Sequence, residues 1–213
     1  MGYLIVVAAA ALLGFLEFRV VDAPLLVQVA FGLALGGLWT GLGVLVTRRL
    51  RRSPRRAAGT AMAAAIANAM LLAPGIILHL MYSTPTRYLA VQQSPAGAST
   101  VAYYAILNPL TEWVLVPLAL WLAWPDRRTR TPILVAAALY YLERAATYLY
   151  FAPAILAWPH RQTTPTLLEQ VTVWLHLDVA RMVVNGVAIA LFAVSALRNM
   201  AVTDRAPTMP TPA

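Results

Sequence analysis

The chain has 213 residues, of which 61% are hydrophobic and only 11% are charged. Soluble domains are roughly half hydrophobic and a quarter charged, so the composition excludes an ordinary soluble domain and predicts an integral membrane protein. The formal net charge is +8, and the chain contains no Cys. Its basic residues are all arginines. A disulfide, a thiolate metal site and a lysine Schiff base are therefore excluded.

The first apolar segment is expected to be a retained helix over residues 3–20. A cleaved signal peptide is the competing interpretation. No basic residue precedes Arg19, and Pro24 directly follows the plausible small-residue cleavage site, which disfavours cleavage.

A second helix is predicted over residues 24–46, which is long enough to span about 30 Å of hydrocarbon. Its glycines form two pairs with small-xxx-small spacing, Gly32–Gly36 and Gly37–Gly41. This spacing lets a neighbouring helix backbone approach closely. The glycine face is therefore expected to pack against another helix. That helix could belong to a second copy of the chain, which would make a homo-oligomer.

The third predicted helix covers residues 57–81 and carries Asn68, Gly75 and His79 on one face. Pro74 interrupts its hydrogen-bond pattern. We expect a kink there and a freed carbonyl, which in a membrane must be satisfied by a neighbour or by water.

Residues 82–100 are polar and are predicted to form the longest loop of the protein. The fourth helix is predicted over residues 101–124. Pro109 and Pro117 lie on either side of Glu112, so we expect an irregular backbone there.

The fifth helix is predicted over residues 132–151 and the sixth over residues 166–197, with a proline-containing loop between them. Residues 199–213 lack apolar periodicity and are predicted to form a disordered tail. The predicted fold is an all-α bundle of about six transmembrane helices.

Six spans place both termini on the same side of the membrane. Arginines cluster at residues 48–56 and 127–130, and short Arg-rich loops remain cytoplasmic. Arg198 and Arg205 would lie on that side too, so both termini are predicted to be cytoplasmic. The opposite side would hold Arg19, Arg87 and Arg161.

The arginine clusters contain no interleaved aromatic residues that could stack on bases, so we expect no nucleic-acid partner. The all-arginine basic set and the alanine content are typical of a GC-rich bacterial genome. The expected location is the bacterial inner membrane, with lipids as neighbours.

Polar residues form stripes on the last two predicted helices. The stripe of the sixth helix consists of Trp174, Asp178, Arg181 and Asn185. Their intervals of four, three and four residues place them within about 60° of arc. The stripe of the fifth helix consists of Tyr140, Glu143, Arg144, Thr147 and Phe151.

The fourth helix adds Asn108 and Glu112, which lie one turn apart. At 1.5 Å rise per residue, Glu112 falls at a depth similar to that of Glu143 and Asp178. Ionisable groups inside a membrane cost roughly 2.5–3.5 kcal/mol each, so they mark a functional site or an obligatory structural pair.

Both interpretations of the charges are open. In the structural one, Glu143 pairs with Arg181 and Asp178 pairs with Arg144, and these ion pairs only set the packing of the helices. In the functional one, three carboxylates exceed two guanidiniums, and Glu112 is the spare acid. Burial would hold such a carboxyl protonated and ready for proton transfer.

These residues are assigned two expected roles. The predicted catalytic residues are Glu112, Glu143, Asp178 and Arg181. The predicted ligand-binding residues are Arg144, Trp174, Asn185, Tyr140 and Asn108. The expected partner is a lipophilic small molecule, because an apolar bundle with a few convergent polar groups is the usual form of such a pocket.

We expect no cofactor and no metal. His79 and His176 could in principle ligate a haem, but His79 is expected near the outer surface and His176 lies off the polar stripe. A metal site built from His79, Glu143 and Asp178 lacks close ligand spacing.

Residues 146–153 read Ala-Thr-Tyr-Leu-Tyr-Phe-Ala-Pro, and Trp174-x-x-x-Asp178-x-x-Arg181 follows after a loop. This stretch of sequence resembles the C-terminal half of the DUF1772 family. That family is an anthrone-oxygenase-like group of small membrane proteins that look like four-helix bundles. The resemblance covers residues 140–197. It implies cofactor-independent oxidation of an aromatic polyketide or a related activity.

The chain departs from that family in two ways. Asp178 stands where the family has an amide or an imidazole, and about two helices are added. If the resemblance is homology, the positions that carry over are Trp174, Asp178 and Arg181.

Three classes of function are therefore expected, in this order. The first is a membrane enzyme or ligand-binding protein in which an arginine holds an oxyanion and a carboxyl moves the proton. The second is an accessory subunit of a membrane complex. The third is a proton-coupled carrier, although the chain lacks the internal repeats found in many carriers.

Overall fold

The structure, a computed structural model, describes residues 8, 11–12, 14–16, 24–47 and 53–204. Within these residues the secondary structure is helical and contains no strand. The predicted all-α fold is therefore confirmed. Most of the predicted first helix, and residues 205–213 of the predicted tail, lie outside the described residues.

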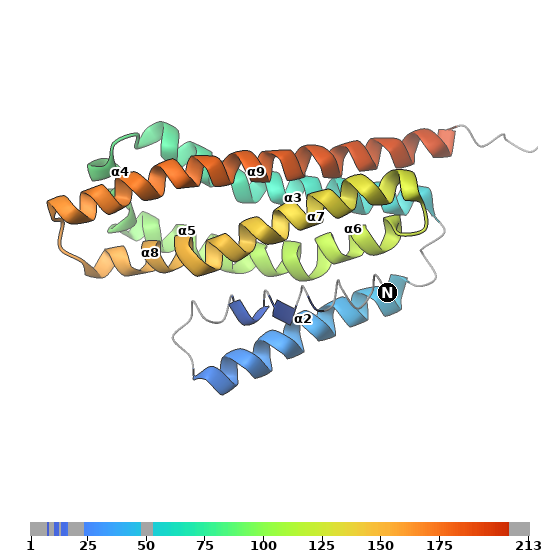
Figure 1. Ribbon diagram of the computed structural model, residues 1–213, viewed down its shortest axis with the longest axis horizontal. Helices are drawn as coiled ribbons and strands as arrows, with labels where there is room; N and C mark the ends of the chain where they lie inside the picture. Colours follow the sequence, from blue (N-terminus) through green and yellow to red (C-terminus); the bar gives the residue numbers. More distant parts are fainter. Residues whose placement is uncertain (1–7, 9–10, 13, 17–23, 48–52, 205–213) are drawn as a thin grey trace, which may run out of the picture.

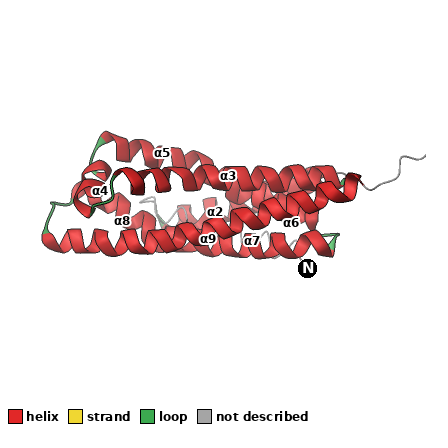
Figure 2. Ribbon diagram, turned by 90° about the horizontal axis from the view of Figure 1, so that it is seen from above, coloured by secondary structure: helices red, strands yellow, loops and turns green. Residues whose placement is uncertain are grey.

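In the described part of the chain, long helical rods run side by side (Figures 1 and 2). The first rod is α3 (Pro54–Met81), and the last is α9 (Pro165–Asp204), which packs antiparallel along α3. Helix α2 (Leu25–Thr47) lies along one side of the bundle. The Thr40 hydroxyl of α2 lies 3.5 Å from the carbonyl oxygen of Trp113.

Each of the two middle rods contains a π-helical turn between two α-helices. The second rod consists of α5 (Pro95–Pro109), η2 (Leu110–Leu115) and α6 (Val116–Ala123). The third consists of α7 (Arg127–Ala146), η3 (Thr147–Phe151) and α8 (Ala152–Ala157). Pro117 and Pro153 follow the two π-turns, and the wider turn absorbs the hydrogen bond that each proline cannot donate. The irregular backbone predicted around Glu112 is confirmed.

The loop predicted over residues 82–100 is wrong for most of its length. The chain forms α4 (Pro85–Gln92) and the beginning of α5 there. Proline stands at the start of each helix, where its missing N–H is not needed, and Thr84 and Ser94 precede these prolines. The Ser94 hydroxyl accepts a hydrogen bond of 3.3 Å from the Ala96 amide.

Several helices extend beyond their predicted ends. The third rod begins at Arg127 because Asp126 caps it, accepting a 3.0 Å hydrogen bond from the Arg128 amide. It continues through Pro153 to Ala157, and the short 3₁₀ turn η4 (Trp158–His160) follows. Helix α9 runs to Asp204, so the predicted disorder is wrong for residues 199–204. The last part of that helix contains no glycine or proline that would stop it.

The two largest apolar cores among the described residues lie at different heights of the bundle. The first joins α3, α6, α7 and α9 through buried alanines, namely Ala61, Ala64, Ala65, Ala119, Ala123, Ala136, Ala137, Ala188 and Ala196. Small residues of this kind let membrane helices pack closely. The second core is aromatic and is formed by Tyr88, Phe151, Trp158 and Trp174 with Leu89, Leu167 and Val171.

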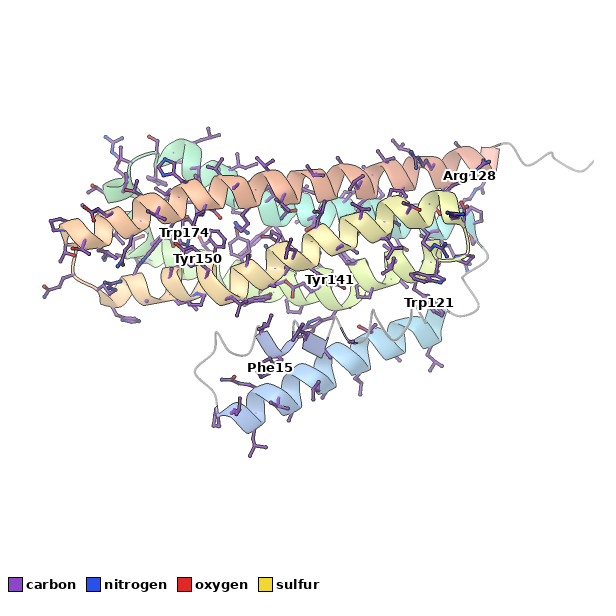
Figure 3. All side chains as sticks on the ribbon, in the orientation of Figure 1. Phe15, Trp121, Arg128, Tyr141, Tyr150 and Trp174 are labelled. Atoms are coloured by element: carbon purple, nitrogen blue, oxygen red, sulfur yellow. The ribbon has the colours of Figure 1, made fainter. Side chains whose placement is uncertain are left out.

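Among the described residues, three helical segments are long and apolar enough to cross a membrane, as expected of a membrane protein. They are Pro54–Met81, Pro95–Ala123 and Pro165–Ala201. Arginines gather at one end of these segments. Arg198, near the end of α9, lies beside the second arginine cluster, with its Nη1 3.3 Å from the carbonyl oxygen of Arg128. Arg128 lies at this end of the bundle (Figure 3).

The carbonyl freed by Pro74 is satisfied by a neighbouring helix, as predicted. Pro74 cannot donate to the Met70 carbonyl four residues before it, and the Tyr103 hydroxyl of α5 donates to that oxygen at 2.8 Å. The next carbonyl, that of Leu71, accepts a 3.2 Å hydrogen bond from Tyr104. The proline thus creates acceptors that hold α3 to α5.

Replacing Tyr103 by phenylalanine is therefore expected to lower the free energy of unfolding by about 1 kcal/mol. The same substitution in a Pro74→Ala background should cost less, because an alanine at this position restores the helical donor to Met70. Thermal unfolding in detergent, followed by circular dichroism, measures both values. Equal losses in the two backgrounds would show that the Tyr103 hydroxyl does not compensate for Pro74.

Candidate functional site

Polar side chains form a layer between the alanine core and the aromatic core. Its centre is Glu143 on α7, whose carboxylate is buried between two guanidiniums. Arg144 donates from Nε to Oε2 and from Nη2 to Oε1 of Glu143, both at 2.6 Å. Arg181 on α9 donates to the same Oε1 through Nη1. Such doubly paired carboxylates are the form in which a charge tolerates burial.

The interhelical pair between Glu143 and Arg181 is thus confirmed, and it joins α7 to α9. The second pair that was expected, Asp178 with Arg144, is wrong. Arg144 instead bonds to the residue before it and to Asn108 Oδ1 at 3.0 Å. Glu143 and Arg144 are adjacent on α7, and neighbouring helical positions do not normally face each other, so helical spacing did not predict this pair.

Glu112 lies in the π-turn η2 and is completely buried. The Tyr148 hydroxyl donates to its Oε1 at 2.7 Å, and Arg144 Nε lies 3.9 Å from the same oxygen. Its backbone carbonyl accepts a 3.1 Å hydrogen bond from Tyr141. Glu112 is therefore embedded in the hydrogen-bonding network and is not an isolated carboxyl.

Asp178 on α9 has two neighbours, one for each oxygen. Arg181 Nε donates to Oδ1 at 2.6 Å. His79 Nε2, from α3, lies 3.6 Å from Oδ2. The imidazole therefore belongs to the polar layer, although its position near the end of α3 suggested a place near the outer surface.

Aromatic rings surround this part of the layer. The Trp174 indole lies between α9 and α8 (Figure 3) and donates to the carbonyl oxygen of Phe151 at 3.3 Å. Its ring centroid is 5.3 Å from that of Trp158 and 5.5 Å from that of Tyr88. Burial raises the pKa of the Tyr88 phenol above its ordinary value, and the Asp178 carboxylate raises it further, so this phenol stays protonated.

A cavity of about 410 Å³ lies between the polar layer and these rings and opens to the outside of the bundle. The charged and polar groups that line it include Asn108, Arg144, Thr147, Asp178 and Arg181. The apolar and aromatic side chains that line it include Leu78, Tyr88, Tyr104, Tyr148, Phe151, Ile155, Leu156 and Trp174. Its volume lies in the range of about 300–1,000 Å³ that is usual for small-molecule pockets.

The predicted site residues fall into three groups: those that line the cavity, those that form ion pairs with its lining arginines, and those that do neither. Those that line it are Asn108, Arg144, Trp174, Asp178 and Arg181. Glu112 and Glu143 lie behind the wall and hold its arginines. Tyr140 and Asn185 are buried but do not line the cavity, and neither Tyr140 OH nor Asn185 Oδ1 has a hydrogen-bond partner among the described residues.

Several residues of the site were not expected. Tyr88 and Gln92 line the cavity from α4, a segment for which the sequence predicts a loop. A Thr-Pro pair at residues 84–85 is the sequence signal that could have found this helix. Tyr148 was also missed, although it follows Arg144 by four residues, so ordinary helical spacing could have placed it beside the polar stripe.

The two histidines considered as haem ligands lie in different surroundings. His79 is half-buried against the aromatic core, and His176 is exposed, with Nδ1 2.8 Å from the Thr172 carbonyl of its own helix. In the part of the chain that the structure describes, no three His, Asp or Glu side chains are grouped so that they could hold a metal ion.

Comparisons of the chain with protein-family models, with curated proteins and with solved structures found no match. The function must therefore be argued from the cavity and the groups that line it.

Proposed function

We propose that this chain is an integral membrane protein whose cavity binds a lipophilic small molecule within the bilayer. The observation that carries the proposal is the composition of the cavity wall, which combines two guanidiniums and Asp178 with several aromatic rings. A molecule with a polar oxygen and an apolar or aromatic body would match both kinds of lining group.

We further propose a multi-pass topology of six spans in the inner membrane, with both termini cytoplasmic. The arginines at the start of α7 and the end of α9 support this orientation, because they gather at one end of the bundle. Arg87 and Arg161 belong to segments at the other end.

An enzyme is the form of this function that we favour. Arg144 and Arg181 would stabilise an oxyanion of the substrate, and the carboxyl groups would move a proton. An oxygenase-like reaction without a cofactor, as the DUF1772 resemblance implies, is one reaction of this kind.

The proposal is tested by extracting the protein in mild detergent and recording its native mass spectrum. We expect an additional mass in the range of a small molecule or a lipid. Arg181→Ala and Asp178→Ala should each lose this mass, because both residues line the cavity. Arg198→Ala, an exposed arginine on the same helix, should retain it. A wild-type protein that carries no additional mass would contradict the proposal.

A second candidate is an accessory subunit of a membrane complex, in which the charges are structural. The specific observation in its favour is that Glu143 and Arg181 join α7 to α9 while Arg144 and Asn108 join α7 to α5. Proteins that co-purify in stoichiometric amounts would favour this function. A small proton-coupled carrier is the third candidate, with the same carboxyl groups as its coupling site.

A homo-oligomer through the glycine face of α2 is also proposed. A Cβ atom placed on Gly37 would meet no atom within 4 Å among the described residues, so this position leaves room for a partner. Close approach of a second helix is what small-xxx-small spacing permits. The oligomeric mass in the same native spectrum tests this proposal.

A further inference from the structure

The contact between His79 and its own helix determines which ring nitrogen carries a proton. His79 Nδ1 lies 3.0 Å from the carbonyl oxygen of Gly75. A carbonyl oxygen only accepts hydrogen bonds, so Nδ1 must be the donor. In a neutral imidazole one nitrogen donates and the other accepts, which leaves Nε2 with a bare lone pair.

That lone pair faces another acceptor. Nε2 lies 3.6 Å from Asp178 Oδ2, and among the described residues it has no hydrogen-bond partner. The Asp178 side chain is 1% exposed and that of His79 16% exposed, so water screens the contact poorly. Two bare acceptors facing each other in a buried site are unfavourable. One additional proton, held on either atom, would turn the repulsion into an attraction.

We propose that His79 and Asp178 hold one shared proton and form the acid–base pair of the cavity. With that proton, the layer contains three cationic groups (His79, Arg144 and Arg181) and three carboxyl groups (Glu112, Glu143 and Asp178). The imidazole thus supplies the third cation that was missing when carboxylates and guanidiniums alone were compared.

The positions of the neighbours suit this role. Asp178 lines the cavity, and its Oδ1 accepts a hydrogen bond from Arg181. Oδ2 is therefore the oxygen that binds and releases the proton. The rings of Tyr88 from α4 and Trp174 from α9 pack against His79, with centroids 5.6 Å and 6.5 Å away. Tyr104 from α5 adds a phenol to the same cavity. Among the described residues, Tyr88, Tyr104 and Arg181 are the titratable or charged groups that lie around the pair.

This inference rests on the proposed small-molecule site and names its ligand class, a lipophilic phenol or enol. Such a ligand can enter the cavity as an oxyanion beside Arg181. The shared proton then moves to the ligand oxygen, so that one O–H bond forms on the ligand and one N–H or O–H bond of the pair breaks. The pair is left with one negative charge beside the Arg181 guanidinium, and the reverse transfer restores it.

The shared proton is tested first, without a ligand, by nitrogen NMR of protein labelled at histidine. The measurement is made at about pH 8, where an exposed histidine is almost entirely neutral. His176 is an internal control, because its Nδ1 has the same contact with a carbonyl and no carboxylate is paired with it among the described residues. Signals are assigned with His79→Gln and His176→Gln.

In the wild-type protein we expect one of two results. Either the nitrogen spectrum shows the additional proton on His79, or an infrared band of a protonated carboxyl group shows it on Asp178. Asp178→Asn should abolish both signals and make the His79 spectrum resemble that of His176. Wild-type protein with a neutral His79 and no such infrared band would overturn the proposal. Asp178→Asn keeps the size of the side chain, and its amide can still accept from Arg181 and donate to a bare His79 Nε2. Its helical content by circular dichroism therefore separates this result from misfolding.

The ligand class is tested with 2-naphthol and its methyl ether, which share the rings and differ in the acidic hydroxyl. Wild-type protein should bind 2-naphthol at least about tenfold more tightly, the difference that one hydrogen bond to a charged group supports. His79→Gln should remove most of this preference. Equal binding of the two probes would overturn the acid–base role and leave the lipophilic site intact, whereas binding of neither would overturn the ligand class.

Discussion

Arg144→Met is expected to lower the free energy of unfolding by about 3–5 kcal/mol, the range found when one partner of a buried ion pair is removed. The Arg144 side chain is only 2% exposed and makes two hydrogen bonds of 2.6 Å to Glu143. It also holds Asn108 and lies 3.9 Å from Glu112. Its loss leaves Glu143 with Arg181 as its remaining guanidinium, and water cannot reach the carboxylate.

The control is Arg198→Met, which makes the same exchange at an exposed position and should change stability by less than about 0.5 kcal/mol. Adding Glu143→Gln to Arg144→Met should recover a large part of the loss, because the polar layer then loses one buried carboxylate charge together with one guanidinium. Reversible unfolding in detergent, followed by circular dichroism, gives all three values. A loss in Arg144→Met no larger than that in the control would show that the polar layer does not hold the bundle together.

Ala152→Phe is expected to reduce ligand retention at least about a hundredfold, a loss of roughly 2.7 kcal/mol of binding free energy. Ala152 lines the cavity from α8 and is only half-buried. A phenyl group there would occupy space beside Phe151 and Trp174 without removing any charge from the polar layer. The substitution therefore separates occupation of the cavity from the stability of the ion pairs, which changes at Arg181 or Asp178 cannot do.

Ala157→Phe is the matched control, because Ala157 is exposed at the end of the same helix and does not line the cavity. It should retain the additional mass in the native spectrum, and both variants should unfold within about 1 kcal/mol of the wild type. Retention of that mass by Ala152→Phe would place the ligand elsewhere. Loss of the mass in both variants would point to a general effect of phenylalanine on α8.

The polar layer shows how far helical spacing along a sequence can lead. Intervals of four and three residues were sufficient to select Asp178 and Arg181 on one face of α9, since that helix is regular. The same reasoning did not select Tyr148, although this residue follows Arg144 by four positions and so lies next to it on the helix. It also missed the direction of Arg144, whose side chain turns back to Glu143 beside it.

His79 illustrates the other limit. Its position near the end of α3 suggested the outer surface, and nothing in the local sequence brings it to Asp178, which lies 99 residues further along the chain. Antiparallel packing of α3 on α9 makes that contact, and the two helices of this pair are far apart in sequence. Tyr88 reached the same place because α4 folds over the end of the bundle, next to Trp158 and Trp174.

By itself the sequence determined the all-helical class, the apolar segments and the faces on which the charged residues of α7 and α9 lie, because composition and helical periodicity act over a few residues. Only the tertiary structure decided which charges pair, that Glu112 is held by Tyr148, and that a cavity lies beside Arg181. Those properties depend on distances between different helices. Such distances are set by the packing of the alanine and aromatic cores, which no local pattern encodes.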